Sequence, residues 1–333
     1  MALPNEGADT ALVDFRSPAH SPLVSARSYL RRTLVFILIG LLLYGLVYWS
    51  AEHLSYRYAK RNRFHAVMTA PHAQYDHVIL GASHAAAFDY EDMNAQLEGM
   101  TNKKILNLSN VGAGIIVNRV MLEYFLTAHR TKTVIYVIDS FAFYAREWNE
   151  NRFQDARLFA RAPFDSSLVP ILLRNSVGLP VVLDYITGFS KINNPDRLKP
   201  DISEDEALKF NKTYRPVSQI DTQRIGFLYP KQTDPQALAH YLSEFESLVL
   251  DLKKRDIRLI VIKPPIPARV YAMLRNEEQF DKALKIIVER FQIDFHDLSL
   301  VANEEKYFFN TDHLNRNGVL NFFEVSLKEI LAQ

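Results

Sequence analysis

The stretch Tyr75-Asp-His-Val-Ile-Leu-Gly-Ala-Ser-His-Ala-Ala-Ala-Phe-Asp89 decides how this chain folds. Val78-Ile-Leu80 is an apolar run typical of a buried strand, Gly81 and Ala82 leave room for a sharp turn, and the alanines that follow favour a helix. Ser83 therefore lies where a strand passes into a helix. In an open α/β sheet this junction is where ligands bind, because they lie outside the carboxyl ends of the strands.

A serine at such a junction can be a nucleophile if a histidine takes its proton. His313 is the candidate, in the loop Phe308-Phe-Asn-Thr-Asp-His-Leu-Asn-Arg-Asn-Gly318 before the last predicted helix. Each residue has an ordinary alternative. Ser83 could be a helix N-cap, since serine satisfies free N–H groups at a helix start, and a lone loop histidine is often a packing residue. Their joint occurrence in one α/β domain favours the catalytic interpretation.

The composition is that of a globular protein without a strong net charge. The chain has 333 residues, 48% of them hydrophobic, enough for one large or two small domains. Lys and Arg (39) nearly balance Asp and Glu (38), so no overall charge points to nucleic acid as a partner. The chain has no cysteine, which excludes disulfides, thiolate catalysis and cysteine-based zinc sites.

Residues 33–54 are predicted to form one transmembrane helix. Its core, TLVFILIGLLLYGLVYWS, carries no charge and would be about 27 Å long as a helix, close to the hydrocarbon thickness of a bilayer. A cleaved signal peptide is the alternative, but about thirty residues precede the run and no small-residue cleavage site follows it. Tyr44, Tyr48 and Trp49 gather at its far end, as an aromatic belt would.

The flanks of this helix do not fix its orientation. Residues 1–32 are predicted to be a disordered tail, and residues 55–74 a basic connector. Four basic residues lie on each side of the apolar run, so the positive-inside rule gives a tie. These residues are Arg16, Arg27, Arg31 and Arg32 before the run, and Arg57, Lys60, Arg61 and Arg63 after it.

From residue 75 the pattern alternates between strands and helices. The expected strands are residues 78–80, 104–108, 133–139, 258–263 and 293–297, and the expected helices are residues 84 onward, 115–129, 235–254, 279–291 and 314–331. Such alternation predicts a doubly wound parallel sheet. Residues 140–233 interrupt it with aromatics, arginines and prolines but no sustained period. We interpret them as an insertion that covers the site and selects what enters; a packing appendage or an oligomer contact is the alternative.

Four short motifs resemble those of the SGNH (GDSL-like) hydrolase superfamily: Ile79-Leu-Gly-Ala-Ser-His84, Asn110-Val-Gly-Ala-Gly114, a strand ending at Asp139, and Asp312-His-Leu-Asn-Arg-Asn-Gly318. The chain is most similar to the membrane-anchored branch, which includes DltD-like proteins and exopolysaccharide O-acetyltransferases. The resemblance covers residues 75–333 without the insertion. It implies an α/β fold with a three-layer, doubly wound parallel sheet, here carrying a large insertion and preceded by one transmembrane helix.

The resemblance also assigns roles to residues. Ser83 would be the nucleophile and His313 the base, while the backbone N–H of Gly112 would hold the oxyanion together with that of the nucleophile. The asparagine of the family's third motif has no clean match, and Asn110 is the nearest candidate.

The acid of the triad departs from the family pattern. Members commonly carry an aspartate three residues before the histidine, whereas this chain has Asn310 there and Asp312 directly beside His313. Asn310 could orient the ring through its amide oxygen, as in papain-like proteases, or the loop could let Asp312 reach the ring. Otherwise the base is weakened and the protein is slow or inactive. Asp312 could also be the N-cap of the last helix.

The function implied is acyl transfer. His313 would take the proton of Ser83, the serine would attack an ester or thioester, and the acyl group would pass to a sugar hydroxyl or to water. The expected substrate is a cell-envelope or exported polysaccharide or an acylated small molecule, with an integral-membrane acyltransferase as partner. The domain is expected on the extracytoplasmic side of the inner membrane. The alternative is a non-catalytic glycan-binding or scaffold protein of an envelope assembly.

Two other kinds of site are weakly supported. Gly112-Ala-Gly114 before a helix could belong to a flavodoxin-like nucleotide or phosphate site, but the chain has neither G-x-G-x-x-G nor a P-loop. The ten histidines form no H-E-x-x-H motif, and His296-Asp297 is interpreted as structural. We therefore expect no cofactor and no metal.

Overall fold

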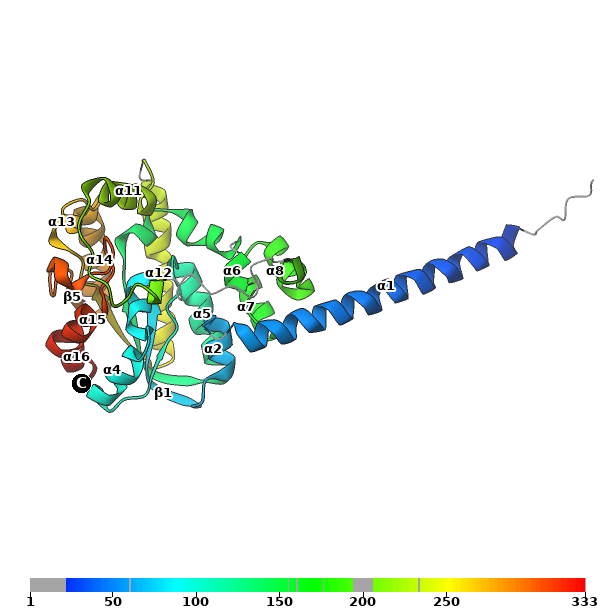
Figure 1. The fold of residues 1–333 in the computed structure, drawn as a ribbon, viewed down its shortest axis with the longest axis horizontal. Helices are drawn as coiled ribbons and strands as arrows, with labels where there is room; N and C mark the ends of the chain where they lie inside the picture. The colour runs from blue at the N-terminus through cyan, green and yellow to red at the C-terminus, as the bar shows by residue number, and fades with distance from the viewer. Residues whose placement is uncertain are drawn as a thin grey trace, which may run out of the picture. The chain divides into compact units, whose positions relative to one another are not determined.

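The computed structural model describes residues 22–59, 61–154, 156–159, 161–175, 177–193, 206–232 and 234–332. The chain divides into two units, Met1–Trp49 and Ser50–Gln333. The first contains most of helix α1 (Pro22–Tyr58) and the second contains the sheet and all other helices (Figure 1).

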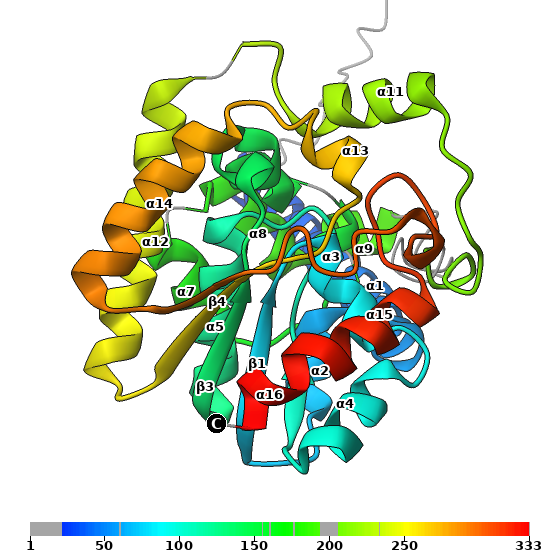
Figure 2. The ribbon, with the colours of Figure 1, turned by 90° about the vertical axis from the view of Figure 1, so that its left-hand side faces the viewer.

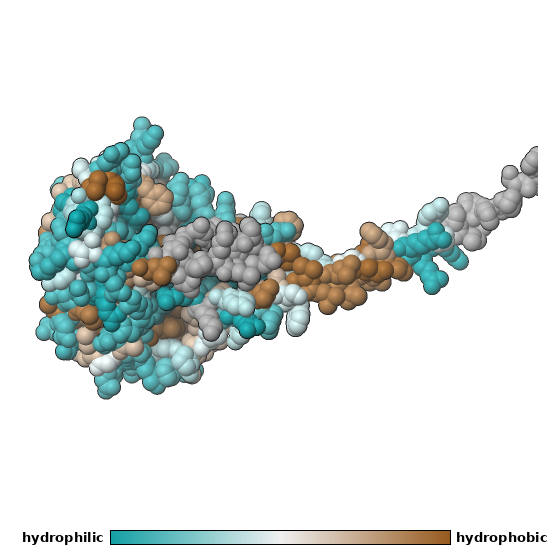
Figure 3. Space-filling view, viewed as in Figure 1, coloured by the Kyte–Doolittle hydropathy of each residue, from teal (hydrophilic) through white to brown (hydrophobic). Residues whose placement is uncertain are grey.

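Helix α1 is the one helix in the described part of the chain that is apolar and long enough to cross a membrane. The apolar stretch Ala26–Tyr58 contains 33 residues, or about 50 Å at the helical rise, longer than the hydrocarbon core of a bilayer. Its large side chains are exposed, Phe36 by 76% and Leu42 by 65%, and they form a brown stripe in the space-filling view (Figure 3). An uncovered stripe of this kind fits a lipid environment.

The second unit is built on a five-stranded sheet in the order β2-β1-β3-β4-β5, with every pair parallel. The three central strands are continuous apolar runs, because helices cover both of their faces. The predicted doubly wound parallel α/β fold is confirmed. The strands are β1 (Gln74–Gly81), β2 (Ile105–Asn107), β3 (Arg130–Val137), β4 (Arg258–Lys263) and β5 (Asp294–Asp297).

Two hydrophobic clusters, one on each face of the sheet, make the domain three-layered (Figure 2). Alternate residues of a strand point to opposite faces, so Leu80 belongs to one cluster and Ile79 to the other. The first cluster joins the sheet to α5 (Ile115–Ala128), α12 (Pro235–Lys254) and α14 (Glu277–Phe291). The second joins it to α3 (Ser83–Ala86), α4 (Met93–Thr101), α15 (Arg316–Phe322) and α16 (Lys328–Ala332).

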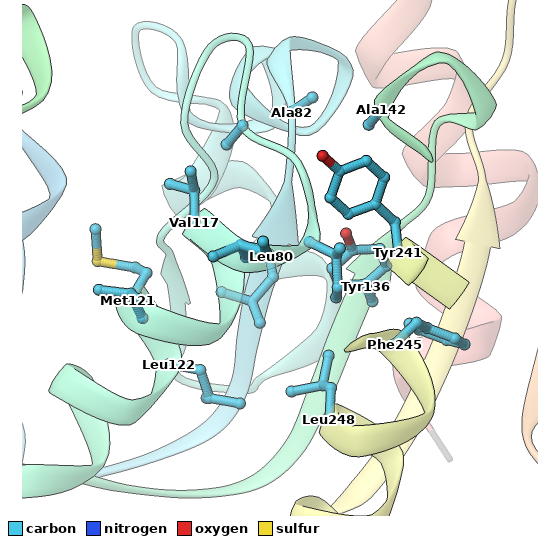
Figure 4. Packing of buried hydrophobic residues seen from close by; sticks show 14 of the residues in the cluster. Leu80, Ala82, Val117, Met121, Leu122, Tyr136, Ala142, Tyr241, Phe245 and Leu248 are labelled. Atoms are coloured by element: carbon cyan, nitrogen blue, oxygen red, sulfur yellow. The ribbon is translucent and has the colours of Figure 1, made fainter. Parts of the chain in front are cut away.

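The first cluster shows how sheet and helices interlock. Leu80 and Tyr136 project from the sheet towards Val117 of α5 and Phe245 of α12 (Figure 4). Tyr136 and Phe245 have ring centroids 5.6 Å apart, and all four side chains are at most 2% exposed. Burying each such side chain stabilises the fold by roughly 1.5–3 kcal/mol.

The stretch between β3 and α12 contains only helices among its described residues. The predicted insertion therefore has secondary structure of its own, in short pieces. These are the 3₁₀ turns η2 (Ser140–Phe143), η3 (Arg146–Trp148) and η4 (Glu150–Gln154), and the helices α6 (Ala156–Phe159), α7 (Leu168–Arg174), α8 (Leu179–Thr187), α9 (Phe189–Asn193) and α11 (Ser218–Leu228).

The helix that precedes the domain is longer than expected. It begins at Pro22, so residues 22–32 of the predicted disordered tail are helical, and residues 1–21 lie outside the described residues. Arg27, Leu30 and Arg31 are good helix formers, but hydropathy marks only the apolar part of a helix. The predicted connector contains the end of α1 and the short helix α2 (Arg63–Thr69).

Two helices of the domain also differ from expectation. The helix expected from residue 84 onward is three pieces, α3, the 3₁₀ turn η1 (Ala87–Asp89) and α4. The closing helix begins at Arg316 instead of Leu314, because the Asn315 side chain accepts the N–H of Gly318 and caps it. It continues through a π-helical turn, η6 (Phe323–Leu327). The remaining elements are α13 (Ala268–Tyr271) and the 3₁₀ turn η5 (Glu305–Tyr307).

Gly81→Ala is expected to destabilise the domain by about 2 kcal/mol or more. Gly81 has φ +147°, and a Cβ there would lie 2.7 Å from the Val137 carbonyl oxygen on the neighbouring strand. Gly99→Ala is the matched control, because nothing lies within 4 Å of its Cβ position on α4; it should stabilise by roughly 0.5–1 kcal/mol. Urea unfolding of the detergent-solubilised chain, followed by tryptophan fluorescence, measures both. Equal stability of the two variants would contradict the close approach.

Candidate active site

Ser83 lies at the switch point of the sheet. From β1 the chain crosses to β2 on one side, and it later enters β3 on the other side, so the crevice between the carboxyl ends of β1 and β3 is open to a ligand. Ser83 directly follows β1 as the first residue of α3 and is 4% exposed. Ala82 is the N-cap and no side chain caps this helix, so the N-cap alternative for Ser83 is wrong.

Ser83 lines a cavity of about 420 Å³, within the size range of small-molecule sites. The hydroxyl has no hydrogen-bond partner among the residues described. The insertion supplies much of the lining, so it forms a wall of the site as well as packing against the body. The lining residues are Ser83, Val111, Gly112, Phe141, Glu147, Trp148, Asn151, Arg152, Glu206, Arg224, Phe227 and Leu228.

Gly112 lies beside Ser83 in the cavity, as an oxyanion donor would have to. Its φ of +70° suits glycine, and a Cβ there would lie 3.2 Å from the Trp148 ring. Within the described part of the chain its N–H has no acceptor, and the N–H of Ser83, in the first helical turn, has none within the helix. Both donors are thus available to a developing negative charge.

Asn110 is not placed for that role. Its backbone N–H donates to the Gly81 carbonyl at 3.1 Å and its side-chain amide donates to the Leu108 carbonyl at 3.2 Å. It does not line the cavity with Ser83 and Gly112. Asn118 of α5 instead connects the two glycine turns: its side chain accepts the Gly81 N–H at 2.9 Å and donates to the Gly114 carbonyl at 2.9 Å.

His313 is held from both sides of its Nδ1 atom. Asn310 Oδ1 accepts the backbone N–H groups of Asp312 and His313 at 3.1 and 2.8 Å, which fixes the orientation of the amide. His313 Nδ1 lies 2.9 Å from the Asn310 amide nitrogen and 3.1 Å from its oxygen, and Asp312 Oδ1 lies 3.3 Å away without a hydrogen bond. The Asn310 amide therefore contacts the ring directly, while Asp312 acts on it through its charge. Asn315 and not Asp312 caps the last helix.

The Asp312 carboxylate belongs to a buried cluster that joins four segments. Arg224 Nε of α11 donates to Asp312 Oδ2 at 2.9 Å. His84 Nε2 lies 3.8 Å from the same oxygen, and His84 Nδ1 bonds Asp139 Oδ1 at 2.7 Å. The rings of His84 and His313 have centroids 4.8 Å apart. Because His84 follows Ser83 directly, these contacts bring His313 to the edge of the sheet that carries the serine.

Charge within the cluster shifts three pKa values. Burial lowers the pKa of His84, but the charge and hydrogen bond of Asp139 and the charge of Asp312 outweigh it and raise that pKa. Burial lowers the pKa of His313, against the opposing Asp312 charge. Burial raises the pKa of Asp312, but Arg224 and then the two histidines hold it well below its usual range. The surroundings thus favour the charged forms of His84 and Asp312 and disfavour a charge on His313.

His84, Asp312 and His313 are also the described residues whose ligand atoms could hold a metal ion, since these atoms lie within 4.8 Å of one another. Nε2 of both histidines and Oδ1 of Asp312 are buried without a hydrogen-bond partner. Against a metal, the Arg224 guanidinium donates to Asp312 Oδ2 at 2.9 Å, so a positive charge already lies on that carboxylate. A divalent cation would have to share the carboxylate with Arg224.

No hydrogen bond joins Ser83 Oγ to His313 Nε2 among the described residues. His313 is 1% exposed and its Nε2 is unpartnered. Catalytic hydrogen bonds are often long or misaligned before substrate binds, so proton transfer requires a side-chain movement that closes this gap.

Sequence reasoning missed His84 and Arg224. His84 stood inside the first motif, and a histidine beside a strand-end serine, with Asp139 ending a strand paired to the same one, was the available signal. No sequence signal marked Arg224, because it lies in an aperiodic insertion, 88 positions before the Asp312 carboxylate to which it donates.

Comparison with known proteins adds little. No family model matches the chain and no curated protein matches it. Among solved structures it is similar to a crystal structure from Bacteroides fragilis described as a "putative acylhydrolase", with 9% sequence identity, 79% of this chain and 90% of that chain covered, and a TM-score of 0.36. A likeness this distant carries no argument, so function has to be argued from the site itself.

Arg224→Met is expected to lower the free energy of unfolding by roughly 3–5 kcal/mol, because it leaves the buried Asp312 carboxylate without its main counter-charge. Arg290→Met is the matched control: Arg290 is paired to Glu246 at 2.9 Å but is 51% exposed, so its loss should cost about 0–1 kcal/mol. Urea unfolding of both variants measures the difference. Similar losses would show that Arg224 does not compensate a buried charge.

Proposed function

We propose that this chain is a membrane-anchored, serine-dependent acyltransferase or esterase, with Ser83 as nucleophile and His313 as base. One observation carries the proposal: Ser83, whose hydroxyl has no hydrogen-bond partner among the described residues, lines one cavity with Gly112 at the sheet's switch point, and His313 lies at the same edge. A nucleophile, a base with its orienting groups and an oxyanion donor are the parts that acyl transfer needs.

The first step forms an acyl-serine. His313 Nε2 takes the Ser83 proton as Oγ bonds to the carbonyl carbon of an ester or thioester. The carbonyl oxygen becomes negative and is held by the N–H groups of Gly112 and Ser83. The tetrahedral intermediate then collapses, the bond to the leaving alcohol or thiol breaks, and His313 returns the proton to that group.

The second step transfers the acyl group. An acceptor hydroxyl gives its proton to His313 and attacks the acyl-serine, and Ser83 leaves and regains a proton from the imidazolium. A sugar hydroxyl as acceptor gives an O-acylated product, and water gives hydrolysis. The insertion forms a wall of the cavity in which the rings of Trp148 and Phe227 meet edge to face, with centroids 5.3 Å apart. This wall supports an acceptor that binds inside the cavity.

Asp312 and Asn310 share the work of the usual triad acid. The buried Asp312 carboxylate, 3.3 Å from His313 Nδ1, would stabilise the imidazolium that forms, and the Asn310 amide, whose nitrogen and oxygen lie 2.9 and 3.1 Å from the same atom, would hold the ring. The Asn310 side-chain oxygen accepts two backbone N–H groups, and these hydrogen bonds hold the amide in place. The change at position 310 thus relocates the acid by two positions.

We further propose a cell-envelope or exported polysaccharide as the acceptor class and an integral-membrane acyltransferase as partner, with the domain outside the cytoplasm. The polar lining of Glu147, Asn151 and Arg152 beside two aromatic rings supports a carbohydrate, because hydroxyls take hydrogen bonds and sugar faces pack on rings. The apolar helix α1 supports an anchor in the inner membrane.

A non-catalytic envelope protein that binds a glycan in the same cavity is the second candidate. The missing hydrogen bond between Ser83 and His313 favours it, together with the full burial of His313. The two candidates differ in one property, the reactivity of the Ser83 hydroxyl.

Ser83 is expected to react with a fluorophosphonate probe, and Ser83→Ala should reduce labelling roughly a thousand-fold or more, the scale at which hydrolases lose activity without their nucleophile. Ser247→Ala is the matched control, since Ser247 is half-buried on α12, outside the cavity, and its hydroxyl donates to the Ser243 carbonyl of its own helix at 3.0 Å. Mass spectrometry of the labelled full chain locates the adduct. Absence of an adduct on Ser83, or equal labelling of Ser83→Ala, would leave the binding protein as the better candidate.

The labelling rate should stay level from pH 8 down to about 6.5, the ordinary pKa of histidine, and fall only below it. The base must be neutral, and burial lowers the pKa of His313, so the imidazole keeps its lone pair into mild acid. Rates measured between about pH 5 and 8 give the midpoint, and circular dichroism over the same range checks that the chain stays folded. A midpoint above 6.5 would mean that another group is the base.

A further inference from the structure

Helix α8 presents an uncovered apolar stripe. Leu179, Leu183 and Ile186 recur at helical spacing and are 59%, 51% and 40% exposed. Val182 and Tyr185 on the opposite face are buried against the body. The helix is therefore apolar on both sides, which a soluble surface helix is not.

The stripe continues beyond the helix. Phe189, the first residue of α9, is 62% exposed, and Leu173 at the end of α7 is 53% exposed. By comparison, Ile286 on α14 is 60% exposed but is flanked by Lys285 and Glu289, which pair with each other. Contiguous exposed apolar side chains mark an interaction surface, whereas single ones do not.

The apolar stripe, defined as Leu173, Leu179, Leu183, Ile186 and Phe189, lies next in sequence to a residue that is paired with the C-terminal part of helix α1. The buried ammonium of Lys191, two residues after Phe189, pairs with Glu52. Glu52 also accepts the backbone N–H of Phe164 at 2.9 Å. Glu52 lies three residues after Trp49, about 5 Å along a helix. The end of the stripe is therefore connected through Lys191 to the part of α1 that belongs to the second unit.

We propose that the apolar stripe lies in the membrane interface, with its side chains among the upper acyl segments of the lipids. The proposal rests on α1 crossing the bilayer and is independent of acyl transfer. Amphipathic interfacial helices place their apolar face about 5–10 Å into the boundary between headgroups and acyl chains. Two observations support this position. Glu52 follows Trp49 by only three residues, and Glu52 forms an ion pair with Lys191 next to the stripe.

Lipid fits the stripe better than a protein partner does. The stripe itself carries no charge, so nothing in it selects a partner by charge complementarity. The two charged residues nearby have partners within the domain: Asp184 accepts the Ser190 N–H at 2.9 Å, and Lys191 forms an ion pair with Glu52. A surface that is apolar, uncharged and adjacent to a membrane anchor matches acyl chains.

The absence of cysteine allows a direct test on the full chain. Leu183→Cys, Ile286→Cys and Leu42→Cys are each labelled with the fluorophore NBD and reconstituted into phosphatidylcholine–phosphatidylglycerol nanodiscs, with and without doxyl-labelled lipid. Ile286 is the matched control, since α14 is separated from α8 by α12, α5 and α7. Leu42 reports whether the anchor is in lipid.

Doxyl lipid should quench the label at position 183 roughly twofold or more, as expected for an interfacial depth of about 5–10 Å, and leave the label at position 286 unchanged. Quenching at 42 without quenching at 183 would overturn the proposal while leaving the anchor intact. Shielding of 183 from aqueous iodide without lipid quenching would also overturn it, because a protein partner or a second copy would then cover the stripe. Fluorophosphonate labelling of the same samples reports the acyl-transfer proposal separately.

Discussion

A buried cluster of paired polar groups at the carboxyl ends of β1 and β3 is the constraint on which the candidate site depends. Arg224 pairs with Asp312, and His84 lies between Asp312 and Asp139 and is hydrogen-bonded to Asp139. A buried charge is costly unless it is paired, so these segments have to meet if the domain is to fold. The same contacts bring His313 to the edge of the sheet that carries Ser83. The pairing of buried charges therefore also assembles the candidate site.

The parts of the fold that could be predicted from sequence are those set by local pattern. Central strands such as residues 133–139 are continuous β-branched runs, and Gly81 and Gly112 stand where the backbone needs glycine. The alternation of strands and helices predicted a parallel sheet, which the structure confirms, whereas the order β2-β1-β3-β4-β5 comes from the structure. The insertion was predicted, but the positions of its short helices were not, because contacts distant in sequence hold them, such as that of Asn62 with the Leu158 carbonyl.

The site was predictable only in part, for the same physical reason. Ser83 and Gly112 meet at one cavity as expected, since both follow strands at one edge. The pairing of His313 with both Asn310 and Asp312 depends on loop geometry that spacing alone leaves open. Asn110 was expected near the oxyanion but is held by Gly81 and Leu108. The roles of Ser83 and His313 in catalysis stay a proposal.

The charge balance around Asp312 restricts how this protein can evolve. Loss of Arg224 alone leaves the buried Asp312 carboxylate without its counter-charge. Loss of Asp139 alone removes the group that raises the pKa of His84. Drift at these four positions therefore has to proceed by compensated exchanges, in which a change of sign or its removal is answered by a second change nearby. In divergent homologues the columns for residues 84, 139, 224 and 312 should co-vary, including in lineages where the serine itself has been lost.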